Sequence, residues 1–247
     1  MEDNIKLLIH KFKQIKYQGW IKSQFKGTGN IGNTFEFLIN KNIDNFSFPD
    51  FNGIEIKTKN RNCKQEYIGL FTAIPYGKDF FEIQRLNNLY GYPDKNFKYL
   101  NILAGDVFCK YKRKIGKKYY FSLKIDHNER KIKLQIFNSK QNFIEDYSYW
   151  EIDELKEKLI RKLSYLAIIK ADKKIHMNEV YYKYNSISIY KLKNYNLFFK
   201  LLREAKIKIQ FRIGIFKKGP RIGTLHDHGT LFAIKEKYLQ ELYDKIY

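Results

Sequence analysis

Residues 48–57 read FPDFNGIEIK and organise the rest of this chain. Successive side chains of an extended strand point to opposite faces, so Ile54 and Ile56 are expected to face the core. Glu55 and Lys57 then share the other face. The Asn-Gly pair just before the strand is a strong turn signal. Together these features predict a hairpin that carries two opposite charges on one face of its second strand.

Three polar side chains of this hairpin fit a hydrolytic site. The turn would bring Asp50, at the end of the first strand, close to Glu55 on the second. Hard divalent cations such as Mg²⁺ take oxygen ligands, commonly one or two carboxylates plus a substrate phosphate. Two acids beside the ammonium group of Lys57 therefore suit metal-assisted attack of water on a phosphodiester. The alternative is an ordinary hairpin whose charged face is simply solvated.

Composition indicates a folded protein with a polyanionic partner. A chain of 247 residues fits one large domain or two closely packed lobes. Its net charge of +21, from 47 Lys and Arg against 26 Asp and Glu, favours nucleic acid. A bias towards A·T-rich codons competes as an explanation, but it would raise Lys without lowering Asp and Glu. Two cysteines indicate a reduced cytoplasmic compartment, and no apolar run approaches the ~18 residues of a membrane span.

A second informative region begins with a strict alternation of apolar residues over residues 207–215. This pattern predicts a strand that leaves Lys208, Gln210 and Arg212 on one exposed face. A loop and a second strand over residues 224–234 would complete a basic two-stranded ribbon. Such a ribbon fits the major groove of DNA, where Arg binds guanine O6 and N7 bidentately.

The loop and the second strand add further candidate DNA contacts. The cations of the loop, where contact with phosphates is expected, are Lys217, Lys218 and Arg221. His226 and His228 share a face of the second strand and would read bases. Two alternatives stay open. The two histidines could be metal ligands, although no third ligand stands nearby in sequence, or the strand face could be solvated.

Periodic apolar positions predict the remaining elements. The expected helices cover about residues 5–15, 34–39 and 152–163, and the expected strands cover about 67–73, 119–125, 132–137 and 165–169. Residues 75–98 mix glycine and proline with aromatics and are expected to be irregular. We place a boundary between two lobes, 1–90 and 91–247, in this region.

The combined motifs resemble the MvaI/BcnI-type restriction endonucleases, a family related to the MutH mismatch-repair nickase. Asp50, Glu55 and Lys57 match the PD-(D/E)xK nuclease signature, and the run GNIGNTFE that ends at Glu36 matches this family as well. The segments FRIG and HDHGT, which begin at residues 211 and 226, resemble its recognition segment. The resemblance implies a mixed α/β fold of the α+β type, with a PD-(D/E)xK core. It also implies a catalytic lobe and a DNA-recognition lobe clamped around the duplex.

The resemblance also implies an activity. It indicates a type II restriction endonuclease that hydrolyses double-stranded DNA at a pseudopalindromic site of the CCWGG, CCSGG or CCNGG kind, one strand at a time. Asp50 and Glu55 would hold Mg²⁺, with Mn²⁺ as a substitute and Ca²⁺ supporting binding without turnover. Glu36 would help to hold metal-bound water, whereas a first-turn Glu also stabilises any helix through its dipole. A monomer in the bacterial cytoplasm is implied, with a cognate DNA methyltransferase as a functional rather than physical partner.

Two departures from the family pattern leave the target open. An acid precedes the recognition arginine in the family, where this chain has Gln210, and a basic residue follows Gly-Thr where it has Ala233. Glutamine favours adenine whereas an acid accepts from cytosine N4, so a different or relaxed target stays possible. The alternative functions are a MutH-like strand-specific nickase with a repair partner and a non-catalytic DNA-binding protein.

Overall fold

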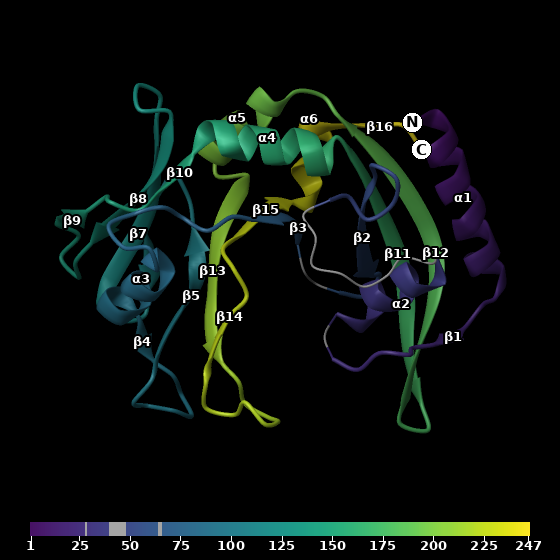
Figure 1. Cartoon of the computed structure of the whole chain (residues 1–247), viewed down its shortest axis with the longest axis horizontal. Coiled ribbons are helices and arrows are strands. Elements are labelled where there is room, and N and C mark those ends of the chain that lie inside the picture. Colours follow the sequence, from purple (N-terminus) through teal and green to yellow (C-terminus); the bar gives the residue numbers. More distant parts are fainter. Residues whose placement is uncertain (28, 40–47, 64–65) are drawn as a thin grey trace. The chain divides into compact units, whose positions relative to one another are not determined.

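The computed structural model describes residues 1–27, 29–39, 48–63 and 66–247 (Figure 1). The chain has a mixed α+β fold and divides into two compact units, each assembled from segments that are far apart in sequence. Unit 1 comprises Met1–Glu66, Glu157–Tyr195 and Gln240–Tyr247, and unit 2 comprises Tyr67–Lys156 and Asn196–Leu239. The expected lobes 1–90 and 91–247 do not coincide with these units, because distant segments complete both.

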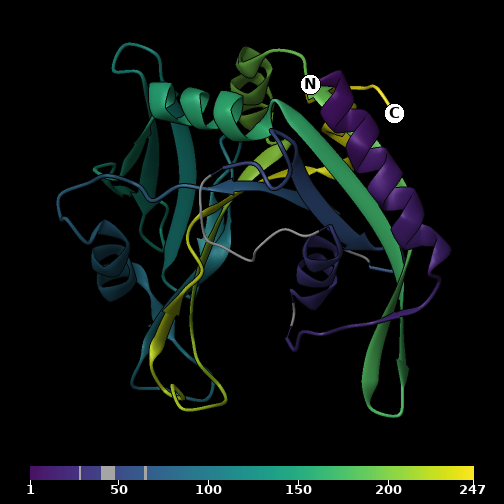
Figure 2. The same cartoon turned by 45° about the vertical axis from the view of Figure 1, so that its right-hand side comes forward.

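Unit 1 is built on a mixed sheet with the strand order β1-β12-β11-β2, in which β16 also pairs with β12. Strand β2 runs parallel to β11, whereas β12 runs antiparallel to it. Figure 2 shows helix α1 lying along the long β11–β12 ribbon. The elements are α1 (Glu2–Tyr17), β1 (Ile21–Lys22), α2 (Asn30–Leu38), β2 (Glu55–Asn60), β11 (Tyr165–His176), β12 (Glu179–Leu192) and β16 (Tyr243–Lys245).

The core of unit 1 lies between the two helices and one face of this sheet. Phe35 of α2 is fully buried, with its ring centroid 5.1 Å from that of Tyr184 on β12 and 6.5 Å from that of Phe12 on α1. Ile54 and Ile56 are buried in the same cluster, as their alternation predicts. The hydrophobic pattern therefore fixes which face of β2 is turned towards the helices.

Helix α2 begins four residues earlier than the sequence predicts. It starts at Asn30, whose side-chain oxygen accepts a hydrogen bond from the hydroxyl of Tyr182. The hydroxyl of Tyr184 donates to a carbonyl of the same first turn at 2.9 Å. These partners come from β12 and stabilise a turn that lacks a strong sequence signal. The expectation that Glu36 lies early in the helix is wrong, because this residue lies in the last turn. Its carboxylate therefore does not stabilise α2 through the dipole at the helix N-terminus.

Unit 2 contains two sheets in its described residues. One has the strand order β3-β15-β13-β5-β4, with β14 also paired to β13, and the other has the order β10-β8-β7-β6, with β9 also paired to β8. The strands of the first sheet are β3 (Tyr67–Thr72), β4 (Tyr92–Pro93), β5 (Asn101–Val107), β13 (Ile207–Ile215), β14 (Leu225–Asp227) and β15 (Leu231–Lys235). Those of the second are β6 (Arg113–Ile115), β7 (Tyr119–Asp126), β8 (Lys131–Phe137), β9 (Phe143–Glu145) and β10 (Tyr149–Glu151).

An aromatic core joins the two sheets of unit 2. The ring centroid of Phe211 on β13 lies 5.9 Å from that of Phe121 on β7 and 6.5 Å from that of Trp150 on β10. The indole N–H of Trp150 donates to the carbonyl of Ala73 at 2.9 Å, so this buried polar group is satisfied.

The remaining elements of the chain are α3 (Glu82–Tyr90), α4 (Ile152–Leu163), α5 (Tyr195–Arg203), η1 (Glu236–Tyr238) and α6 (Leu239–Leu242).

The structure confirms most of the expected elements: the helices at 5–15 and 152–163 and the strands at 67–73, 119–125, 132–137 and 207–215. Residues 75–98, however, are not wholly irregular. They contain α3, which is anchored by the ion pairs of Arg85 with the buried carboxylates of Glu82 and Glu145, both at 2.6 Å. These carboxylates raise the pKa of Arg85 and hold it charged. In the described part of the chain, no helix is long and apolar enough to cross a membrane.

Candidate active site and DNA-binding surface

Asp50 is held at the entry to β2 by a tight turn. The backbone groups of Phe51 and Ile54 exchange hydrogen bonds of 2.9 and 2.8 Å, and the two residues between them, Asn52 and Gly53, have positive φ values of 44° and 89°. Asn-Gly is the pair that such a turn favours. The Asp50 carboxylate accepts a hydrogen bond from the Ile56 N–H at 2.8 Å. The predicted turn is therefore present, although only a single bridge stands in place of the first strand.

Glu55 is the most deeply buried carboxylate of this site, with 1% of its surface exposed. Its Oε1 accepts from the ammonium group of Lys57 at 2.5 Å. Its Oε2 is buried and has no hydrogen-bond partner among the described residues. Burial raises the pKa of Glu55 above its ordinary value; Lys57 opposes this rise, and the negative charge of Asp50 adds to it. Glu55 and Asp50 are thus close enough to repel one another, which favours a cation beside them.

Two further residues of this site were not identified from the sequence. The ammonium group of Lys162, in the last turn of α4, lies 3.5 Å from Glu55 Oε1. Tyr243 of β16 is fully buried, and its hydroxyl has no hydrogen-bond partner in the described part of the chain. Burial and the charge of Glu55 raise the pKa of Tyr243. Both residues are far from β2 in sequence and come near Glu55 only in the folded chain, so no local sequence motif indicates them.

Glu36 belongs to helix α2, which packs against strand β2. Its carboxylate is beside Gly32, where the hydroxyl of Thr58 on β2 also lies. Among the residues that the structure describes, no group of three or more His, Cys, Asp and Glu side chains is placed to hold a metal ion. The donors present nevertheless fit a hard divalent cation, because Asp50 and Glu55 supply carboxylate oxygens and the buried Oε2 of Glu55 lacks a partner.

The expectation that Lys208 lies on an exposed face is wrong. Its side chain is buried, and its ammonium group pairs with Asp106 at 2.7 Å and lies 4.1 Å from the ring centroid of Tyr67. The cause is the neighbouring strand β5, which places Asp106 beside β13. Gln210 and Arg212 are half-buried. The guanidinium group of Arg212 donates to the carbonyl of Gly229 at 3.0 Å and to that of His228.

The predicted second strand of the ribbon is interrupted. Residues 224–234 form β14 and β15, separated by Gly229 with a positive φ of 73°. His228 falls outside β14, but its ring centroid lies 3.6 Å from that of His226. The ring of His226 stacks on that of Phe216, with centroids 4.0 Å apart. The guanidinium group of Arg221 lies over the ring of Phe216, 4.2 Å from its centroid. Aromatic stacking thus brings together three of the predicted DNA contacts.

The two lysines of this loop differ in their partners. Lys217 pairs with the buried carboxylate of Asp94, so its charge is already engaged. Lys218 is exposed. Burial, followed by the electrostatic effects of His226 and Arg212, lowers the pKa of His228, which favours its neutral imidazole. A neutral imidazole offers one donor and one acceptor, as base contacts require.

Comparison with known proteins identifies the chain. The model of the MvaI/BcnI restriction endonuclease family matches residues 9–243. The solved complex of restriction endonuclease MvaI with its cognate DNA substrate is similar with a TM-score of 0.91 and 33% identity, over 99% of this chain and 98% of that chain. Restriction endonuclease MvaI in the absence of DNA has a TM-score of 0.60 and 32% identity, over 99% of this chain and 97% of that chain. No curated protein sequence matches.

A fold and a site of this kind, with these similarities, define a site-specific DNA endonuclease of the restriction type. The chain belongs to the MvaI/BcnI restriction endonuclease family. The resemblance read from the motifs around Asp50, Glu55 and Lys57 is therefore confirmed at the level of the family.

Proposed function

We propose that this endonuclease hydrolyses phosphodiester bonds of double-stranded DNA with Mg²⁺ held by Asp50 and Glu55. The supporting observation is the buried Glu55 carboxylate, one oxygen of which is bound by Lys57 while the other has no partner in the described residues. A buried carboxylate oxygen without a hydrogen bond is costly, and a cation would compensate for it. Mn²⁺ would substitute for Mg²⁺, and Ca²⁺ would support binding without turnover.

The side chains of the site would divide the chemistry among them. Mg²⁺, when bound, supplies polarisation of the phosphate and a lower pKa for water. Lys57 orients Glu55 and positions the attacking water or stabilises the negative charge that develops on the phosphate. Glu36 of the neighbouring helix α2 would help to hold the same water. Asp50 is oriented by its hydrogen bond from Ile56 N–H, so its carboxylate needs little rearrangement.

DNA recognition is proposed for the β13–β14 ribbon and its loop. Gln210, Arg212, His226 and His228 would read bases, and Lys218 and Arg221 would contact phosphates. Lys208 and Lys217 each have a carboxylate partner and would contribute less directly. We assign the target to the short pseudopalindromic class CCWGG, CCSGG or CCNGG. A target that differs from this class would be due to Gln210, which stands where the family has an acid.

The number of candidate active sites in one chain determines whether a monomer cuts the two DNA strands together or in turn. The described residues contain one Asp50–Glu55–Lys57 arrangement, so a monomer would cut the two strands in successive events. We place the enzyme in the bacterial cytoplasm, where a cognate methyltransferase would protect the host DNA.

Digestion of an unmethylated supercoiled plasmid with Mg²⁺ tests this function. We expect a nicked circle first and a linear product afterwards, with run-off sequencing locating both cuts within one short motif. Nicking that never proceeds to linear DNA, or that requires a hemimethylated site, would instead favour the MutH-like nickase. An absence of cleavage with Mg²⁺ and Mn²⁺ would contradict the proposed metal chemistry.

A further inference from the structure

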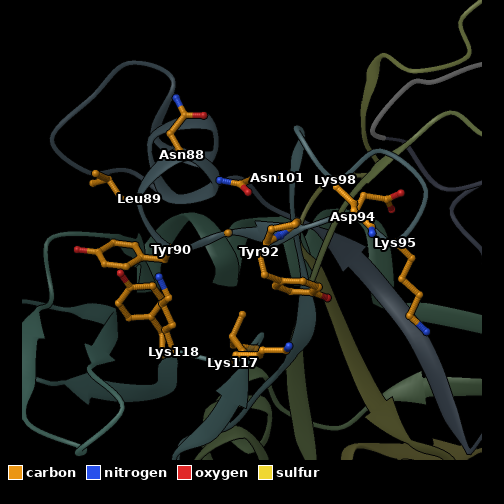
Figure 3. A pocket seen from close by; sticks show the side chains of 14 residues that line it. Asn88, Leu89, Tyr90, Tyr92, Asp94, Lys95, Lys98, Asn101, Lys117 and Lys118 are labelled. Carbon is orange, nitrogen blue, oxygen red and sulfur yellow. The ribbon is translucent and has the colours of Figure 1, made fainter.

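We propose that a lysine-rimmed pocket of unit 2 binds backbone phosphates of DNA outside the bases that the ribbon reads. The pocket has a volume of about 680 Å³ and lies between the end of α3, strand β4 and the β6–β7 turn. Figure 3 shows Lys95 and Lys98 on one side of it and Lys117 and Lys118 on another. The proposal rests on DNA as the substrate of the family and, for its location, on the loop between β13 and β14 proposed above as a DNA contact, but not on the roles proposed for Asp50 or Glu55.

The charge of the pocket is unbalanced. Its four lysines are exposed, and none of them has an ion-pair partner in the described part of the chain. Asp94, a carboxylate in the lining, is buried and already accepts from Lys217 and from the N–H groups of Asn96 and Phe97, the latter two at 2.8 and 3.1 Å. Like charges lining a concave surface reinforce one another and concentrate the potential there. A polyanion is the ligand that such a surface attracts.

The walls of the pocket are rigidly placed. Gly116 in the β6–β7 turn has a φ of 59°, and a Cβ atom there would lie 2.8 Å from Cβ of Tyr92. The turn that carries Lys117 and Lys118 is therefore packed directly on β4. Tyr90 contacts Tyr119 edge to face, with ring centroids 5.0 Å apart. The lysine stems thus project from a fixed backbone, which reduces the entropy lost when an anion binds.

The pocket is physically joined to the recognition loop. Lys217 of that loop pairs with Asp94 in the pocket wall, and its ammonium group lies 5.3 Å from the ring centroid of Phe97. A Cβ atom on Gly223, at the end of the same loop, would also be in contact with Phe97, at 3.5 Å. A strand of DNA engaged by the loop would consequently have neighbouring phosphates near the lysine rim.

Phosphate oxygens are the part of DNA that fits this rim. Lysine ammonium groups bind phosphates as point charges and do not distinguish bases, so the contact would add affinity without sequence preference. A free polyphosphate has the same chemistry, and the experiment below separates these two sources.

Lysine acetylation, read by peptide mass spectrometry, tests the location. The full chain is labelled in EDTA alone, with a random-sequence duplex, or with inorganic pyrophosphate. We expect the duplex to protect the four pocket lysines and to leave Lys6 and Lys13, on the exposed face of α1, fully reactive. Equal labelling of the pocket lysines with and without duplex would overturn the proposal. Protection by pyrophosphate but not by the duplex would overturn DNA as the ligand.

Binding across a salt series tests the energetic contribution. Each lost phosphate contact reduces the slope of log K against log salt by about 0.9, so Lys117→Ala/Lys118→Ala should lower the slope by about two and weaken binding to all duplexes alike. The matched control, Lys6→Ala/Lys13→Ala, changes the net charge equally and should keep the slope. Lys117→Arg/Lys118→Arg should also keep it. Equal slope losses in the pocket and control variants would assign the effect to net charge and overturn the site. Because no metal is needed, loss of cleavage by other variants does not affect this result.

Discussion

At the scale of single residues, Asp50, Glu55 and Lys57 share one proposed function but make different contacts. Asp50→Ala and Glu55→Ala each remove a proposed metal ligand and should abolish cleavage while leaving DNA binding largely intact. Lys57→Ala removes the cation that orients Glu55 and should slow cleavage by about 10²–10³-fold, as loss of one transition-state donor does. Single-turnover cleavage and filter binding of the same variants measure both effects. Near wild-type cleavage by any of the three would show that the active site lies elsewhere.

Ionisation of Glu55 should lower the stability of the protein when no metal is bound. Its pKa in the folded protein is above its ordinary value of 4.5 because it is buried, so the folded state binds this proton more tightly than the unfolded chain. Stability from this group is therefore present at low pH and is lost as pH rises through the folded pKa. We expect Glu55→Gln to have a higher melting temperature than wild type at pH 7 in EDTA, with a difference that shrinks towards pH 4.5.

Glu179 supplies a control for this experiment. Its side chain is 48% exposed and pairs with Lys22 at 3.2 Å. Glu179→Gln should leave the melting temperature nearly unchanged at both pH values, because exposed ion pairs contribute little. A lower melting temperature for Glu55→Gln at pH 7 would mean that Lys57 and Lys162 stabilise the ionised carboxylate more than burial destabilises it.

At the scale of elements, the β13–β14 ribbon and its loop carry two kinds of proposed DNA contact. Arg212 is oriented by carbonyls of Gly229 and His228, whereas Lys218 is exposed in the loop. Arg212→Ala should cost about 1–3 kcal/mol at the cognate site and little on random duplex. Lys218→Ala should weaken both duplexes alike and reduce the salt slope by about one. Equal losses on both duplexes for Arg212→Ala would contradict its role as a base reader; thermal melting of both variants checks the fold.

Local patterns predicted the elements whose signal lies within the element itself. The Asn-Gly turn and the alternation around Glu55 identified the entry to β2, and the apolar alternation over residues 207–215 identified β13. Both signals consist of side chains that are neighbours in sequence. The helical spacing that ends near Leu163 similarly identified α4.

Other features depend on partners that are distant in sequence, and local patterns could not reveal them. The first turn of α2 is stabilised by Tyr182 and Tyr184, which lie on β12. Lys208 alternates like an exposed residue but meets Asp106 across the sheet. Lys162 reaches Glu55 because β11, which follows α4, runs parallel to β2. Sequence reasoning therefore found the motif residues of the candidate site and missed the side chains that surround them.

At the scale of the whole molecule, the segment Gln240–Tyr247 completes a unit whose other parts lie far upstream. Its strand β16 pairs with β12, and Tyr243 is fully buried there. Deletion of residues 240–247 should abolish cleavage and lower the stability of unit 1. Tyr243→Ala should cost about 3–5 kcal/mol of unfolding free energy, as large-to-small core changes do. Urea unfolding followed by circular dichroism measures both variants.

Tyr243→Phe is the control for the contribution of the hydroxyl. That group is buried and has no hydrogen-bond partner in the described residues, so its removal should not lower the stability. A clear loss of stability or of cleavage in Tyr243→Phe would instead show that the hydroxyl supports Glu55 directly.

The interleaved order of the two units has a consequence for how the cell makes this enzyme. A ribosome adds about 5–20 residues per second, so roughly ten seconds or more separate the synthesis of β2 from that of β16. During this interval Glu55 has emerged, but the strand that carries Tyr243 does not yet exist. A nascent chain therefore cannot assemble the complete surroundings of Glu55, and fragments from interrupted translation would leave the chromosome uncut.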